Sequence, residues 1–222
     1  MKIGIIGAGN MGGAIARGLA ADPDFCTADI TVCSPNNHGE LDALKADYPD
    51  MNVDTDNEKA ILGTDIIILA VKPWLVYDVM DPLSPKIQWE KQMLVSVVAG
   101  ITLSQLEDLS LCTPPAMFRV MPNTAIAVRK SMTFICSIGA SDEQIKSVSG
   151  IFRRLGSVMV IDENQMTACM ALASCGIAYA MRYVRAASEG GVELGVKADL
   201  AKDIVLQTMQ GAAALLQATG AH

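Results

Sequence analysis

The stretch "MKIGIIGAGNMGGAIARGLAAD", residues 1–22, decides the fold. Its apolar run from Lys2 to Ile6 is rich in β-branched residues, which is typical of a strand buried on both faces. Three glycines follow in the spacing G-x-G-x-x-G, and residues 10–21 carry apolar side chains at helical spacing. A strand, a tight turn and a helix in this order predict a site for the diphosphate of a dinucleotide.

Each of the three glycines has a physical reason in that interpretation. Gly7 permits the tight turn out of the strand, and Gly9, without a Cβ, lets the backbone approach a pyrophosphate. Gly12 lets the helix pack closely on the strand, and the free N–H groups of the helix N-terminus then face the phosphates. The alternative is a glycine-rich turn that has only a structural role.

The rest of the chain continues the alternation of strands and helices up to residue 162. We expect strands at 29–33, 65–71, 93–98, 117–121, 133–136 and 158–161, and helices at 39–48, 55–63, 102–109 and 142–155, with another ending at Met80. This order predicts an α/β fold with a doubly wound parallel sheet of the Rossmann type, residues 1–162. Residues 163–222 contain no strand pattern and predict two or three helices, with a break at "EGGVELG", residues 189–195.

Composition excludes several classes of function. The net charge is −7 and no cluster of lysine and arginine occurs, which argues against a nucleic-acid partner. Six scattered cysteines and two histidines predict no metal site, and we expect the cysteines to be small buried side chains in a reducing, cytoplasmic compartment. The apolar segment from Met166 to Met181 is too short to span a membrane and is typical of a buried helix at a subunit interface.

The end of the second strand indicates which dinucleotide is bound. NAD sites usually carry an acidic residue there, whereas "TVCSPNN", residues 31–37, offers only the uncharged groups Ser34, Asn36 and Asn37. This favours NADPH, with NAD as the alternative. Two further strand ends, "AVKP" at 70–73 and "AG" at 99–100, have small residues that leave room for a nicotinamide ribose. Lys72 either contacts substrate or is simply solvated.

Four motifs resemble one family. "IGIIGAGNMGGAI", "ILAVKP", "VSVVAGIT" and "FRVMPNT" occur in the order and spacing of pyrroline-5-carboxylate reductases. The resemblance implies reduction of Δ1-pyrroline-5-carboxylate to L-proline with NADPH or NADH, and a helical second domain that forms a homodimer or a larger homo-oligomer. It also implies a set of cofactor contacts: Ile6, Gly7, Ala8, Gly9, Asn10, Met11, Gly12, Ser34, Asn36, Asn57, Ala70, Val71, Lys72, Pro73, Ala99 and Gly100.

The same resemblance suggests the substrate site. The family has a Glu followed by a Ser-Gly-Ser-Gly-Pro-Ala-Tyr run, and this chain has Glu163 and "ASCGIAY", residues 173–179. Asn123, Ser174 and Gly176 are the candidates for substrate binding, and Glu163, Cys175 and Tyr179 are the catalytic candidates. Each catalytic candidate has a structural alternative: compensation of a helix dipole for the Glu, and core packing for the Cys and Tyr.

Two departures from the family bear on activity. The run contains Ala, Cys and Ile where Ser, Ser and Pro are common, and the chain ends at His222 before the family's "TSPGG-T" loop. We therefore expect the helical domain to be incomplete at its C-terminus. Two other functions stay open: another small NADP-linked reductase of the β-hydroxyacid dehydrogenase type or of the deazaflavin-linked type, and a non-catalytic NADPH-binding protein.

Overall fold

A computed structural model describes residues 1–110 and 116–221. By its internal contacts the chain forms two compact units, Met1–Ser174 and Cys175–His222. The first unit contains the sheet and the helices that cover it, and the second contains two helices. Residues 163–174, which the sequence analysis assigned to the helical domain, pack within the first unit.

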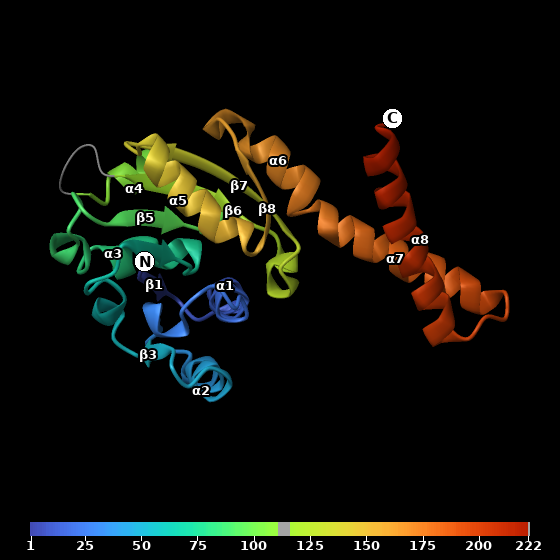
Figure 1. The fold of residues 1–222 in the computed structure, drawn as a ribbon, viewed down its shortest axis with the longest axis horizontal. Helices are drawn as coiled ribbons and strands as arrows, with labels where there is room; N and C mark the ends of the chain where they lie inside the picture. The colour runs from blue at the N-terminus through green and yellow to red at the C-terminus, as the bar shows by residue number, and fades with distance from the viewer. Residues whose placement is uncertain (111–115, 222) are drawn as a thin grey trace. The chain divides into compact units, whose positions relative to one another are not determined.

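The described part of the first unit contains one eight-stranded sheet in the order β3-β2-β1-β4-β5-β6-β7-β8 (Figure 1). The strands are β1 (Ile3–Ile6), β2 (Ile30–Cys33), β3 (Asn52–Asp54), β4 (Ile66–Leu69), β5 (Met93–Ser96), β6 (Met117–Met121), β7 (Ser131–Ile138) and β8 (Gly156–Val160). All neighbours are parallel except β6 and β7. The strand order reverses between β1 and β4, and ligands of such sheets bind beyond the carboxyl ends of the strands at that point.

Helices flank the sheet, and short 3₁₀ turns connect several of the elements (Figure 1). The α-helices of the first unit are α1 (Asn10–Ala20), α2 (His38–Asp47), α3 (Val76–Met80), α4 (Leu103–Glu107), α5 (Asp142–Arg153) and α6 (Met166–Ala173). The 3₁₀ turns are η1 (Thr27–Asp29), η2 (Asn57–Ala60), η3 (Pro73–Leu75), η4 (Ser84–Lys86), η5 (Thr124–Val128) and η6 (Glu163–Gln165).

The apolar strands of the sheet supply two cores, one on each face. Ile66 and Ile68 of β4 belong to a cluster with buried residues of α1, α2 and α5. Ile67 and Leu69 of the same strand belong to the other cluster, with residues of α3, α4 and α6. Because successive side chains of a strand point to opposite faces, a strand covered on both sides must be apolar throughout. This confirms the predicted doubly wound sheet.

Some local predictions were wrong. The strand β3 was not expected, and residues 55–63 form only the short turn η2 in place of the predicted helix. Most of "EGGVELG" lies inside a helix, and the chain leaves helical structure only after Glu193. Cys33 and Cys136 are buried as expected, whereas Cys26 and Cys175 are exposed. Cys112 lies outside the described residues.

The second unit consists of α7 (Gly176–Glu193) and α8 (Ala198–Thr219), which pack against each other. The helices approach closely at Gly191, where a Cβ would lie 3.2 Å from the Cβ of Ala201. Ala201 is the one apolar residue that the described part of this unit buries. Large side chains on both helices, including Tyr179, Leu200 and Ile204, are more than half exposed. Among the described residues, no helix is both long enough and apolar enough to cross a bilayer.

Candidate functional site

The turn from β1 into α1 has a backbone that only glycine fits at two positions. Gly7 has φ +105°, and a Cβ there would lie 2.6 Å from the carbonyl oxygen of Ala70. A Cβ on Gly12 would lie 1.9 Å from the carbonyl oxygen of Gly7, so α1 packs directly on the turn. Both contacts are shorter than a real Cβ tolerates, so these two glycines are required by the fold itself.

Gly9 differs from Gly7 and Gly12 because no atom of the described residues lies within 4 Å of the position its Cβ would take. Its backbone is extended, with φ −79° and ψ −170°, which other residues can adopt. The fold therefore gives no reason for glycine here, and the open space beside the backbone is where a ligand can approach. A pyrophosphate fits this arrangement.

The N-terminus of α1 is prepared for an anion. Gly9 is the N-cap residue, no side chain caps the helix, and the first turn has no acidic residue. The first N–H groups of a helix have no partner within it, and the helix dipole adds partial positive charge there. An anionic phosphate group can satisfy both.

A cleft of about 600 Å³ opens at this turn, at the carboxyl ends of β1, β2 and β4. Its lining includes most of the predicted cofactor residues: Gly7, Ala8, Gly9, Asn10, Met11, Ser34, Asn36, Asn57, Ala70, Val71 and Lys72. These residues come from four separate segments of the chain, which the parallel strands bring to one edge of the sheet.

Other predicted cofactor residues lie outside this lining. Ile6 is fully buried within the sheet, and Gly12 packs against the turn. Pro73 begins η3, and Ala99 and Gly100 are exposed residues that follow β5. The lining also includes Asn37, which the sequence placed at the end of the second strand, and three residues that were not predicted: Pro35, Leu75 and Val79. The last two come from η3 and α3, and the apolar spacing of the helix after "AVKP" is the signal that could have found them.

The polar groups of the cleft fit a dinucleotide. The side-chain oxygen of Asn57 is buried and has no hydrogen-bond partner among the described residues, so it can accept a hydrogen bond from a ligand hydroxyl. The Asn37 side chain donates to the carbonyl oxygen of Ala8 at 2.5 Å and thereby ties the end of β2 to the glycine turn. Among the described residues that line the cleft, none is a carboxylate and Lys72 is the one charged residue.

Cys33, the last residue of β2, is not available for chemistry. Burial raises the pKa of its thiol to about 12, and the nearby carboxylate of Asp54 acts in the same direction. A thiol with such a pKa stays protonated near neutral pH, and only the thiolate is a good nucleophile. The side chain is therefore part of the core beneath the cleft.

Two of the predicted substrate residues lie together in the first unit. Asn123 follows β6, accepts a hydrogen bond from the Ala125 N–H at 3.1 Å and donates to the carbonyl oxygen of Ala173 at 3.4 Å. The Ser174 hydroxyl donates to the carbonyl oxygen of Pro122 at 3.3 Å. The turn after β6 and the end of α6 are thus joined by two polar contacts.

Glu163 is held by groups that are distant in sequence. Its Oε1 accepts from the backbone N–H of Leu103 and from the Arg119 guanidinium, each at 2.8 Å. The Arg119 side chain is only 11% exposed, and its Nε is buried without a partner in the part of the chain that the structure describes. The carboxylate therefore compensates the positive end of the α4 dipole and the charge of the partly buried Arg119. No local sequence pattern indicates that Arg119 is the partner of Glu163.

Cys175, Gly176 and Tyr179 belong to the second unit, at the start of α7. Cys175 is the N-cap residue of that helix, and its side chain is exposed. Tyr179 is 67% exposed. Neither side chain is part of the core of its own unit. Within the described chain, core packing therefore does not explain Cys175 or Tyr179.

Comparison with known proteins agrees with this geometry. Residues 2–100 match the family model described as NADP oxidoreductase coenzyme F420-dependent, and residues 163–222 match that of pyrroline-5-carboxylate reductase dimerisation. Pyrroline-5-carboxylate reductase 2 of Bacillus subtilis is 33% identical over 220 residues, covering 99% of this chain and 78% of that protein. Pyrroline-5-carboxylate reductase 1 of Dictyostelium discoideum is also 33% identical, over 99% of this chain, which spans only 41% of the length of that relative.

A solved structure shows the same fold with a cofactor. The crystal structure of Plasmodium falciparum pyrroline carboxylate reductase with NADP bound superimposes with a TM-score of 0.86 and 27% sequence identity, covering 98% of this chain and 79% of that one. The glycine turn, the open cleft beside Gly9 and these matches lead to one conclusion. The chain belongs to the pyrroline-5-carboxylate reductase family.

Proposed function

We propose that this protein reduces Δ1-pyrroline-5-carboxylate to L-proline with NADPH. The observation that carries the proposal is the site at the β1–α1 turn, where two glycines are required by packing and a third faces open space. The uncapped N-terminus of α1 and the unpartnered oxygen of Asn57 add the polar groups that a dinucleotide needs. Membership of the family supports the choice of substrate.

The work of the protein in this reaction is placement. The reduced nicotinamide supplies a hydride when it is bound, and a protonated imine is the better hydride acceptor. The chain holds the diphosphate at α1 and the adenosine side near Ser34 and Asn36, and it must bring the imine carbon within about 3–3.5 Å of the hydride donor. Apolar side chains of the cleft, among them Leu75 and Val79, keep water away.

Within the first unit, the substrate is assigned to the turn after β6 and the end of α6, where Asn123 and Ser174 lie together. We keep Asn123, Ser174 and Gly176 as the residues proposed to bind it, and Cys175 and Tyr179 as catalytic candidates. We assign Glu163 a positioning role, because its carboxylate is already bonded to Arg119 and to the N-terminus of α4. From there it holds the start of η6, which leads directly into α6.

Preference for NADPH over NADH follows from charge. A carboxylate at the end of β2 would repel the 2′-phosphate of NADPH, and Ser34 and Asn36 are neutral hydrogen-bonding groups. We also propose that the enzyme is cytoplasmic, in keeping with five free cysteines among the described residues.

We also propose that the protein forms a homo-oligomer through its second unit. The helices α7 and α8 leave large apolar side chains exposed and bury almost none of them. Large apolar side chains left exposed in such number mark an interaction site, and a second copy of the chain is the partner we propose. We further propose that the functional division falls at residue 163, where the match to the dimerisation family begins.

The experiment that tests the proposed function follows the nicotinamide absorbance in a mixture of protein, NADPH and Δ1-pyrroline-5-carboxylate. We expect substrate-dependent loss of the reduced form and the appearance of L-proline by mass spectrometry. If the protein oxidises a β-hydroxyacid with NADP⁺ and does not reduce Δ1-pyrroline-5-carboxylate, it is the rival dehydrogenase. Cofactor binding without any turnover would identify a non-catalytic NADPH-binding protein.

A further inference from the structure

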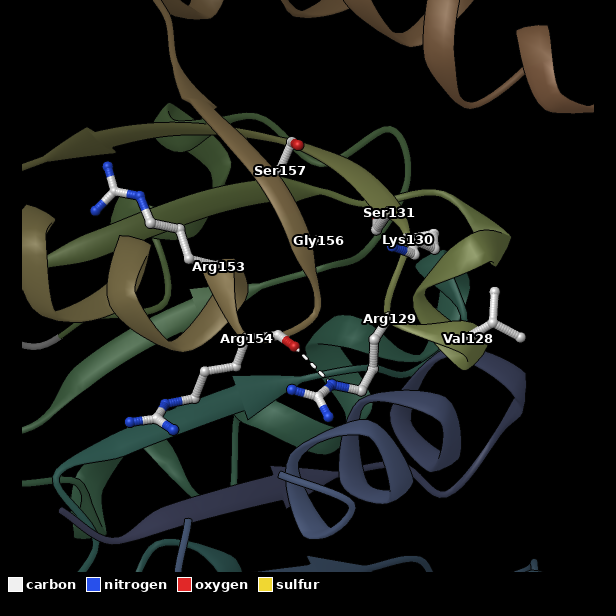
Figure 2. Close-up of a pocket in the computed structure, with 8 residues that line it drawn as sticks. All are labelled: Val128, Arg129, Lys130, Ser131, Arg153, Arg154, Gly156 and Ser157. Carbon is white, nitrogen blue, oxygen red and sulfur yellow. Dashed lines mark hydrogen bonds between the residues drawn. The ribbon is translucent and has the colours of Figure 1, made fainter. Parts of the chain in front are cut away.

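A second cavity, of about 620 Å³, lies in the first unit and shares no residue with the glycine-rich cleft (Figure 2). Half of its lining is cationic: Arg129 and Lys130 precede β7, Arg153 ends α5, and Arg154 is the C-cap residue of that helix. The β7–β8 register pairs Ser131 with Gly156, which brings these two dipeptides to the same end of the strands. Neither pair suggests a site in the sequence, because 22 residues separate them.

One carboxylate is bonded to this cluster of four cations. Asp22 accepts from Arg154 at 2.8 Å and lies 3.5 Å from Arg129. The hydrogen bond from Arg154 lowers the pKa of Asp22, so its charge is present at neutral pH. Lys130 and Arg153 are exposed, and neither side chain makes a hydrogen bond or an ion pair with the described residues. The cavity therefore keeps an excess of positive charge in a chain whose net charge is −7.

The fixed half of the cluster is preorganised. Arg129 donates from Nε to the carbonyl oxygen of Arg154 at 2.9 Å, the dashed line in Figure 2. Figure 2 also shows the side chains of Arg153 and Arg154 pointing in different directions from the end of α5, and Arg153 is exposed. The guanidinium groups of Arg129 and Arg154 are held in fixed positions. The long side chains of Lys130 and Arg153 are unpaired among the described residues and can adapt to the position of a ligand.

The backbone of Arg129 is a further sign that its side chain matters. It is the one non-glycine residue with positive φ in the described chain, at φ +56° and ψ +37°, where it ends η5. Glycine is the usual residue at such a C-cap, because a Cβ is strained there. An arginine retains the strain and gains a guanidinium at the edge of the cavity.

We propose that this cavity binds a small phosphate-type anion with two or more negative charges. Guanidinium groups match the oxygen pairs of phosphoryl groups, and charge-assisted hydrogen bonds of this kind are the strong ones. The exposed Ser157 hydroxyl at the start of β8 adds a neutral donor. The overall negative charge of the chain disfavours a nucleic acid, whose charge extends well beyond one cavity. The proposal does not depend on the reaction proposed above.

Calorimetry with inorganic pyrophosphate tests this site. The protein is first saturated with NADP⁺, so that the glycine-rich cleft is filled, and pyrophosphate is then added at constant ionic strength. We expect binding to the wild type and a loss of affinity of about tenfold or more in the K130A/R153A variant. Both residues are exposed and unpaired, so this variant should unfold at the wild-type temperature.

Two further variants serve as a charge-matched control and as a test of Arg129. K2A/K91A removes the same charge from exposed sites outside the cavity and should bind pyrophosphate within about twofold of the wild type, since separated surface charges are screened. R129G relieves the strained backbone and removes the guanidinium, so it should fold well and bind more weakly. Absence of heat with the NADP⁺-saturated wild type, or unchanged affinity in K130A/R153A, would overturn the proposal.

Discussion

The replacement of Gly9 by alanine separates cofactor binding from folding. Nothing lies within 4 Å of the added methyl group, and the backbone of Gly9 is in a region that alanine adopts. Because Gly→Ala at such a position reduces the entropy of the unfolded chain, we expect the free energy of unfolding to change by less than about 1 kcal/mol. The methyl group instead occupies the space through which a pyrophosphate approaches the N-terminus of α1.

The magnitude follows from the hydrogen bonds that would be lost. Phosphate oxygens must come within about 2.7–3.2 Å of backbone N–H groups, which a methyl group beside the backbone prevents. The loss of one charge-assisted hydrogen bond costs about 1.5–3 kcal/mol, which corresponds to roughly a tenfold to hundredfold rise in the Kd for NADPH. Titration calorimetry measures the Kd, and urea unfolding measures stability.

Two other glycines provide the controls. Gly39 of α2 also has open space at its Cβ but does not line the cleft, so Gly39→Ala should leave the Kd unchanged. Gly12→Ala places a Cβ 1.9 Å from a carbonyl oxygen and should destabilise the fold, in contrast to Gly9→Ala. If Gly9→Ala binds NADPH as tightly as the wild type, the reasoning about the open space beside Gly9 is refuted.

Three more predictions concern charged and polar groups. Glu163→Gln leaves the buried Arg119 without its counter-charge, so urea unfolding should show a loss of about 1–3 kcal/mol, and the KM for the imine should rise as α6 loses its anchor. The hydrogen bond from Arg154 lowers the pKa of Asp22 below its usual 3.8, so this carboxylate stabilises the fold above about pH 4 and that contribution is lost as the pH falls through the lowered pKa. Unfolding measured from pH 7 to pH 3 should therefore show a smaller loss in Asp22→Asn than in the wild type. Ser34→Asp should lower kcat/KM for NADPH by about tenfold or more and change that for NADH much less, because the new carboxylate repels the 2′-phosphate; steady-state kinetics with both cofactors decides this.

The sequence predicted those parts of the fold that local pattern determines. The strand β4 reads as an unbroken apolar run because both of its faces are covered, and the glycine turn is identified by its spacing. The strand β3 was not predicted, because it has only three residues, of which Val53 alone is apolar, and it lies at the edge of the sheet. The antiparallel pairing of β7 with β6 could not be predicted either, because an apolar run does not indicate in which direction its strand pairs.

The candidate site was predictable where chemistry follows a strand end, and not where it depends on long-range contacts. Residues after β1, β2 and β4 were expected in one cleft because parallel strands bring their carboxyl ends together. The partner of Glu163 is Arg119, 44 residues away, and no local pattern links the two. The cationic cavity was missed for the same reason, because two dipeptides become one cluster only through the pairing of β7 with β8.

A crystal structure of this protein with NADP⁺ tests the central claim most directly. We predict that the diphosphate lies against the open side of Gly9, with its oxygens within hydrogen-bond distance of the backbone N–H groups at the start of α1. We also predict a ribose hydroxyl bonded to the unpartnered oxygen of Asn57. A cofactor bound elsewhere, or a diphosphate that makes no contact with the glycine turn, would contradict the account.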